Sequence, residues 1–165
     1  MSLDLFKYIM LLIGTADFLM YISYIWGKFG IQKSISISFY DLVWRDRNIF
    51  RFFIWILSAS IIVNGIGLDT PLFFISGGLL SLVGIFTRIK VRWKYYIHMV
   101  GAIGGIISCA IGVVLLNFNT GIISIISILF ITLLTFIFGE KKHILWNIEV
   151  ICFTSLMSTL LYLNY

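Results

Sequence analysis

Residues 96 to 116 read YIHMVGAIGGIISCAIGVVLL, 21 residues without a single Asp, Glu, Lys or Arg. A helix of about 20 apolar residues is long enough to cross the hydrocarbon core of a bilayer. The run lacks the period-two alternation of membrane β-barrel strands, and outside a barrel only a helix satisfies its own backbone hydrogen bonds in lipid. The stretch therefore predicts a membrane-spanning helix.

Similar apolar stretches fill most of the chain. The 165 residues are 61% hydrophobic and only 12% charged, whereas a soluble domain is usually about one-quarter charged. The predicted spans are 5–26, 49–66, 71–89, 96–116, 121–138 and 144–163. We therefore expect an all-α protein, a polytopic membrane bundle of about six transmembrane helices that forms one domain over residues 1–165.

The basic residues are distributed unevenly between the two sets of connections. Only Lys7 lies in one set, and eleven of the twelve lie in the other: Lys28, Lys33, Arg45, Arg47, Arg51, Arg88, Lys90, Arg92, Lys94, Lys141 and Lys142. Short cytoplasmic loops retain Lys and Arg during insertion. We therefore expect the basic loops to be cytoplasmic and both termini to lie outside. The formal charge of +5 then reports orientation, and no nucleic-acid partner is expected.

Two predicted spans carry small residues at helical spacing. The stripes are Gly77, Ser81 and Gly84 in the third span and Gly101, Gly105, Ser108 and Gly112 in the fourth. Small residues allow two helices to approach closely in lipid. We expect these stripes to serve packing within the chain, and we infer no oligomer from them.

Three ionisable residues lie inside the spans: Asp17, His98 and Glu149. Such residues cost about 2.5 to 3.5 kcal/mol each on insertion scales, so they face the bundle interior and are candidates for function. His98 and Glu149 are predicted at equal depth, a little inside the cytoplasmic ends of their helices. Three alternatives are open for the pair: a polar clasp that locks two helices, a ligand or proton site, or no contact between the two side chains.

Asp17 differs because it lies near the bilayer midplane. For this intramembrane acid we expect a hydrogen bond with Ser58 or Ser60 in the second span, or with Tyr21 one turn away, rather than a bound ion. A buried polar group is costly unless it is hydrogen-bonded. The sequence thus predicts a structural role for Asp17.

Catalytic patterns are sparse. Ser36 or Ser38 with His98 and Glu149 supplies the residue types of a Ser-His-acid arrangement, but no nucleophile-elbow glycines surround either serine. A metal site needs three or four convergent ligands, which the sequence does not offer. We expect no metal and no cofactor, and a non-enzymatic protein rather than an enzyme.

Several motifs, in order along the chain, suggest a family. They are SISISFY at 34–40, RNIF at 47–50, YIH at 96–98 and WNIE at 146–149. In this order they resemble the small six-helix bacterial and phage membrane proteins grouped as domain of unknown function 998, which are loosely similar to DRAM-like membrane proteins. The loop motif of that family ends in paired tyrosines. Here Tyr40 fills the second position, and Phe39 replaces the first tyrosine.

The resemblance implies one cytoplasmic-side polar site built from Ser36, Tyr40, Arg47, His98 and Glu149, in a bacterial inner (cytoplasmic) membrane. It implies no activity. We therefore predict an integral membrane protein whose polar pocket binds a lipid headgroup or a small ligand, with membrane lipids as its partners. Three alternatives remain open: an accessory structural subunit of a larger membrane complex, a lipid-modifying enzyme, and a proton or ion pathway.

Overall fold

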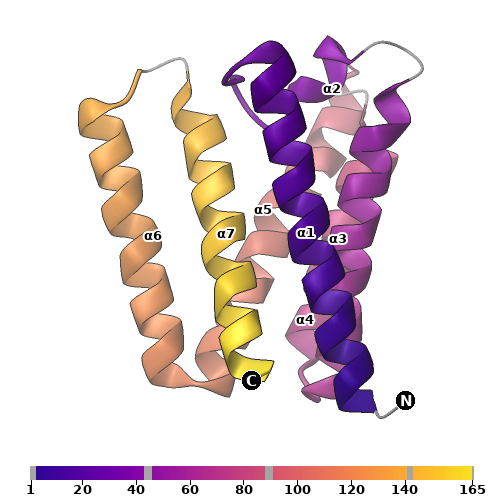
Figure 1. The fold of residues 1–165 in the computed structure, drawn as a ribbon, viewed down its shortest axis with the longest axis vertical. Coiled ribbons are helices and arrows are strands. Elements are labelled where there is room, and N and C mark those ends of the chain that lie inside the picture. Colours follow the sequence, from indigo (N-terminus) through magenta and orange to yellow (C-terminus); the bar gives the residue numbers. More distant parts are fainter. Residues whose placement is uncertain (1–2, 43–45, 88–90, 141–142, 165) are drawn as a thin grey trace.

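The computed structural model describes residues 3–42, 46–87, 91–140 and 143–164, and within them all regular structure is helical (Figure 1). The helices are α1 (Leu3–Phe29), α2 (Ser38–Asp41), α3 (Arg47–Gly67), α4 (Pro71–Ile85), α5 (Arg92–Leu116), α6 (Phe118–Phe138) and α7 (Ile144–Asn164). The prediction of an all-α chain is confirmed, and each predicted span coincides with one of the longer helices.

Among the described residues, five helices are long and apolar enough to cross a membrane: α1, α3, α5, α6 and α7. The third predicted span, 71–89, is too long, because α4 has 15 residues and ends at Ile85. Residues 88 and 89 lie outside the described residues. The chain leaves the helix at Phe86, whose carbonyl oxygen faces the imidazole Nδ1 of His98 at 3.2 Å, a contact between α4 and α5 that sequence hydropathy does not register.

The helices form an antiparallel bundle in which neighbours along the chain pack together. α3 packs on α4, α4 on α5, α1 on α3, and α6 on α7. In Figure 1 the start of α1 and the end of α7 lie at one end of the bundle, and α2, the end of α6 and the start of α7 lie at the other. The helix ends next to the predicted basic loops therefore share one end of the molecule. Arg45, Arg88, Lys90, Lys141 and Lys142 themselves lie outside the described residues.

Glycines let α4 lie close to both of its neighbours. A β-carbon added at Gly77 would lie 2.6 Å from the carbonyl oxygen of Ser58 on α3, and one added at Gly101 would lie 2.6 Å from the carbonyl oxygen of Leu79 on α4. Real β-carbons do not approach backbone so closely. The prediction that the small-residue stripes serve packing within the chain is confirmed at these two positions.

The segment between α1 and α3 folds into the end of the bundle. Its short helix α2 was not predicted from the sequence. The buried residues of this segment are Ser34, Ile35, Ser38, Phe39 and Leu42. The Phe39 ring lies edge-on to Phe50 of α3 at 5.8 Å, and the hydroxyls of Tyr21 and Ser38 are hydrogen-bonded. These contacts place the segment over the core, where it contributes to the site described below.

Lys7, the basic residue predicted at the opposite end, is buried. Its ammonium donates a hydrogen bond to the carbonyl oxygen of Gly67 at 3.1 Å and pairs with Asp4 at 2.6 Å. The contact joins the start of α1 to the end of α3. Lys7 therefore stabilises the junction of the two helices instead of projecting from the bundle.

Candidate functional site

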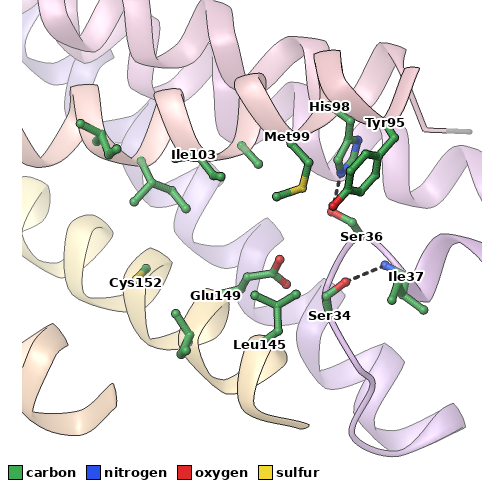
Figure 2. A pocket seen from close by; sticks show the side chains of 14 residues that line it. Ser34, Ser36, Ile37, Tyr95, His98, Met99, Ile103, Leu145, Glu149 and Cys152 are labelled. Carbon is green, nitrogen blue, oxygen red and sulfur yellow. Dashed lines mark hydrogen bonds between the residues drawn. The ribbon is translucent and has the colours of Figure 1, made fainter. Parts of the chain in front are cut away.

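A cavity of about 440 Å³ lies between α5, α7 and the segment 34–37 (Figure 2). It is lined by Ser34, Ser36, Ile37, Tyr95, His98, Met99, Ala102, Ile103, Ile106, Ile107, Leu145, Ile148, Glu149 and Cys152. The two serines, His98 and Glu149 bring polar atoms to it, and most of the remaining lining side chains are aliphatic. The cavity is therefore amphipathic.

His98 is buried, with an exposed fraction of 2%, and both of its ring nitrogens have partners. Nδ1 lies 3.2 Å from the carbonyl oxygen of Phe86, and Nε2 lies 2.8 Å from the hydroxyl oxygen of Ser36. Because a carbonyl oxygen only accepts, Nδ1 carries a hydrogen, and in the neutral imidazole Nε2 then accepts from the serine hydroxyl. The ring is thereby fixed in one orientation.

Glu149 approaches the cavity from α7. One of its carboxylate oxygens accepts a hydrogen bond from the backbone N–H of Ile35, and in Figure 2 the carboxylate points into the space between α5 and α7. The hydroxyl oxygen of Ser34 accepts from the backbone N–H of Ile37 at 3.1 Å. Because these bonds hold the backbone of the segment, its two serines are presented to the cavity.

His98 and Glu149 do not bond to each other. The direct clasp that the sequence suggested is wrong, because the segment 34–37 lies between the two helices and donates a hydrogen bond to each side chain. The prediction compared only the depths of the two side chains along their helices, so it did not consider a loop folded between those helices. The two side chains are linked instead through consecutive residues, Ile35 and Ser36.

The structure brings together three of the five predicted pocket residues. Ser36, His98 and Glu149 line one cavity, whereas Tyr40 and Arg47 do not. Those two lie around Phe39: the Tyr40 ring is 5.4 Å from the Phe39 ring, and the Arg47 guanidinium carbon is 5.4 Å from the same ring centre. Folding of α2 turns Phe39 into the core and keeps Tyr40 and Arg47 with it, away from the cavity.

Several lining residues were not predicted. On α5, Tyr95 and Ala102 lie three residues before and four residues after His98, and on α7, Leu145 and Cys152 lie four residues before and three residues after Glu149. Residues three or four apart share one face of a helix. This spacing was readable in the sequence once His98 and Glu149 were taken as starting points.

A second cavity of about 490 Å³ adjoins the first one. It lies between α5, α6 and α7 and is lined by Ile106, Ile107, Ala110, Ile111, Val114, Ile122, Ile125, Ile128, Leu129, Cys152 and Leu156. Three of these residues, Ile106, Ile107 and Cys152, line both cavities. An aliphatic groove thus continues from the cavity that holds Ser36 along α5 and α7.

The predicted partners of Asp17 bond elsewhere. The hydroxyls of Ser58 and Ser60 donate to carbonyl oxygens of their own helix at 2.7 and 2.8 Å, and that of Tyr21 bonds with Ser38. Serines inside apolar helices commonly bond the preceding turn in this way. The prediction is therefore wrong: the Oδ2 atom of Asp17 is buried and has no hydrogen-bond partner among the described residues.

No family model matches the chain, and neither a curated protein nor a solved structure matches it. The resemblance to the six-helix family consequently stays a prediction. Among the described residues, no group of three or more His, Cys, Asp and Glu side chains is placed to hold a metal ion.

Proposed function

We propose that this chain is an integral membrane protein that binds a membrane amphiphile between α5 and α7. The polar headgroup lies at Ser36, His98 and Glu149, and an acyl chain follows the aliphatic groove. The observation that carries the proposal is the lining of the two adjoining cavities, polar near the segment 34–37 and aliphatic beyond it. A ligand that matches both parts has a polar head and an apolar tail.

The lipid environment is supported by the surface of α6. Large apolar side chains are exposed on it, among them Phe130 at 59%, Phe136 at 67% and Phe138 at 81%. Soluble monomers rarely expose apolar patches of this extent, and such patches mark contact with a membrane or a partner. We propose six crossings, in which the shorter α4 packs against both α3 and α5.

The proposed orientation follows from the basic residues. With the basic connections cytoplasmic, both termini lie outside, and the polar part of the cavity is at the cytoplasmic end of the bundle in a bacterial inner membrane. Headgroups of the inner leaflet lie at that depth. A lipid of that leaflet then reaches the cavity without crossing the bilayer.

Glu149 limits the chemistry of the headgroup. A carboxylate repels a phosphate held close to it and attracts an ammonium or a hydroxyl donor. Ser34 and Ser36 both donate and accept hydrogen bonds. The proposed ligand is therefore a lipid whose headgroup carries amine or hydroxyl groups at the point of contact.

Lipid retained through purification tests the proposal. The protein is extracted with a mild detergent, and bound lipid is quantified by mass spectrometry for wild type, Glu149→Gln and Ala102→Leu, the last of which narrows the cavity. His143→Ala and Glu140→Gln are matched controls, because neither residue lines the cavity.

We expect a defined lipid in wild type and both controls, and its loss in the two cavity variants. Equal lipid in all five proteins would show that the lipid covers the outside of the bundle and would refute binding in the cavity. The same spectra reveal any co-purifying protein, which is the outcome expected for a subunit of a larger complex.

A second candidate function, lipid modification, is favoured by one distance. The Ser36 hydroxyl oxygen lies 2.8 Å from His98 Nε2 beside the aliphatic groove. A serine hydrogen-bonded to a histidine is the pair that performs acyl transfer in many hydrolases, with a third group orienting the ring. Here that group is the carbonyl of Phe86 and not Glu149.

An alkyl fluorophosphonate, which labels nucleophilic serines, tests this candidate. Labelling of wild type and Ser38→Ala but not of Ser36→Ala or His98→Ala would support an enzyme. Absence of labelling in wild type would reject the enzyme and leave lipid binding as the proposed function.

A further inference from the structure

A separate cavity of about 280 Å³ lies between α1 and α3. It is lined by Asp17, Met20, Tyr21, Tyr24, Ile49 and Phe53, and it shares no lining residue with the cavity between α5 and α7. Asp17, Tyr21 and Tyr24 follow one another at intervals of four and three residues, which places them on one face of α1. The proposed lipid site makes no use of this cavity.

Asp17 brings an acid to this cavity. Its Oδ2 atom is buried and has no hydrogen-bond partner among the described residues. Within those residues, Asp17 also forms no ion pair with a Lys or Arg. An acid inside a membrane protein is expensive and is usually paired or functional. The partner that Asp17 lacks among the described residues is one that a ligand can supply.

The cavity has aromatic walls and opens toward lipid. Tyr21 and Phe53 stack in parallel at 4.3 Å and form its buried side. Met20 and Ile49, which are 65% and 42% exposed, form its outer side. One turn beyond Tyr24, the Lys28 ammonium donates a hydrogen bond to the Tyr24 hydroxyl at 2.9 Å. The faces of aromatic rings attract cations.

We propose that this cavity binds a small organic ammonium ion with an apolar body, which enters from the hydrocarbon phase. The carboxylate of Asp17 provides the opposite charge, and the rings of Tyr21, Tyr24 and Phe53 contact the alkyl groups around the nitrogen. A tertiary or quaternary ammonium suits this lining, because it is attracted by charge and by aromatic faces without requiring several hydrogen-bond acceptors.

The depth of Asp17 separates this ligand from a lipid headgroup. Asp17 lies near the middle of α1, which has 27 residues, so it is about 18 Å or more along the helix from either end at 1.5 Å per residue. The ammonium of a phospholipid stays at the interface. A metal ion is excluded as the natural occupant because one carboxylate beside two phenols and aliphatic groups does not replace its hydration shell.

Two probes of equal shape test the proposal. Phenyltrimethylammonium carries the charge, and tert-butylbenzene replaces its nitrogen by carbon. Binding of each is measured by calorimetry on the full chain in lipid nanodiscs, with empty nanodiscs as the blank. We expect saturable binding of the cation only, weakened about tenfold or more by Asp17→Asn, which removes the charge and keeps the shape.

Matched variants separate the cavity from a general surface effect. Asp69→Asn removes an exposed acid in the connection between α3 and α4, away from the cavity, and we expect no change. Tyr24→Leu removes a ring, for which we expect roughly fivefold weaker binding, whereas Tyr24→Phe keeps the ring and the affinity. Thermal unfolding of each variant identifies any that fails to fold.

Either of two results overturns the proposal: the folded Asp17→Asn protein binds the cation as wild type does, or the neutral probe binds as tightly as the cation. Protection of Asp17 from a hydrophobic carbodiimide gives a second readout within wild type. The cation should slow modification of Asp17 and leave that of Glu149 unchanged. Because the two cavities are separate, failure here leaves the lipid proposal unaffected.

Discussion

The imidazole Nε2 of His98 lies 2.8 Å from the hydroxyl of Ser36, a residue 62 positions earlier in the chain. The residue before Ser36, Ile35, donates its backbone N–H to Glu149 of α7. One short segment is thus held by α5 and by α7 at consecutive residues. This double attachment closes the cavity at its polar part.

Ser36→Ala should destabilise the protein modestly. The substitution leaves the buried Nε2 of His98 without its partner, and an unmade hydrogen bond of this kind costs about 1 to 3 kcal/mol. Unfolding by heat or denaturant in one detergent measures the loss. Ser23→Ala, at an exposed position of α1, is the matched control, and an equal change in both variants would argue against the His98 bond.

Glu149→Gln and Glu149→Leu should differ in stability. Glutamine keeps a side-chain oxygen that accepts from Ile35, whereas leucine leaves the buried N–H of Ile35 unpaired at a cost of about 1 to 3 kcal/mol. The same unfolding assay compares them. Glu140→Leu, at a side chain that is 70% exposed, serves as control. A glutamine variant as unstable as the leucine variant would mean that the negative charge itself stabilises the segment.

Gly77→Ala and Gly101→Ala should each destabilise the bundle by about 1 to 3 kcal/mol, because the added methyl group overlaps a backbone carbonyl of the neighbouring helix. Gly78→Ala is the control. No atom lies within 4 Å of its added β-carbon, and alanine favours helix by up to about 1 kcal/mol over glycine. The midpoint temperature of thermal unfolding should therefore be higher for Gly78→Ala than for the other two variants. Equal midpoints for all three variants would contradict the close approach of α3, α4 and α5.

Cysteine labelling tests the proposed orientation. Cys109 and Cys152 are buried, so wild type should react little with a membrane-impermeant maleimide. We expect Asp4→Cys to be labelled in intact cells and Lys33→Cys only after permeabilisation, since the two residues lie at opposite ends of the bundle and cytoplasmic loops carry the Lys and Arg excess. The reverse pattern would invert the topology and place the polar part of the cavity outside.

Much of the fold was predictable because it depends on properties of continuous segments. The length and apolarity of each run locate the helices, and hydropathy placed all of the long ones near their observed bounds. The end of α4 was missed by several residues. The predicted span was extended to Ile89 because Phe86 and Ile89 are apolar, but the chain leaves the helix where Phe86 meets His98, and that contact joins two different segments.

The candidate site was predictable in part. His98 and Glu149 stood out because ionisable residues are rare inside spans, and both line the cavity. Tyr40 and Arg47 were grouped with them by motif order alone, whereas the folding of α2 around Phe39 takes them elsewhere. Asp17 was assigned serine partners, but those hydroxyls bond the carbonyls of their own helix, which are always within reach.

Composition and charge along the chain thus determined that it is helical, that its helices suit a bilayer, and which residues are costly to bury. The convergence of Ser36, His98 and Glu149 depended on the folded chain, and so did the burial of the Asp17 Oδ2 atom without a hydrogen-bond partner among the described residues. The physical reason is that the hydropathy of a segment depends only on its residues and does not change when the helix rotates about its axis. A hydrogen bond exists only at one rotation, one depth and one path of the loop between helices.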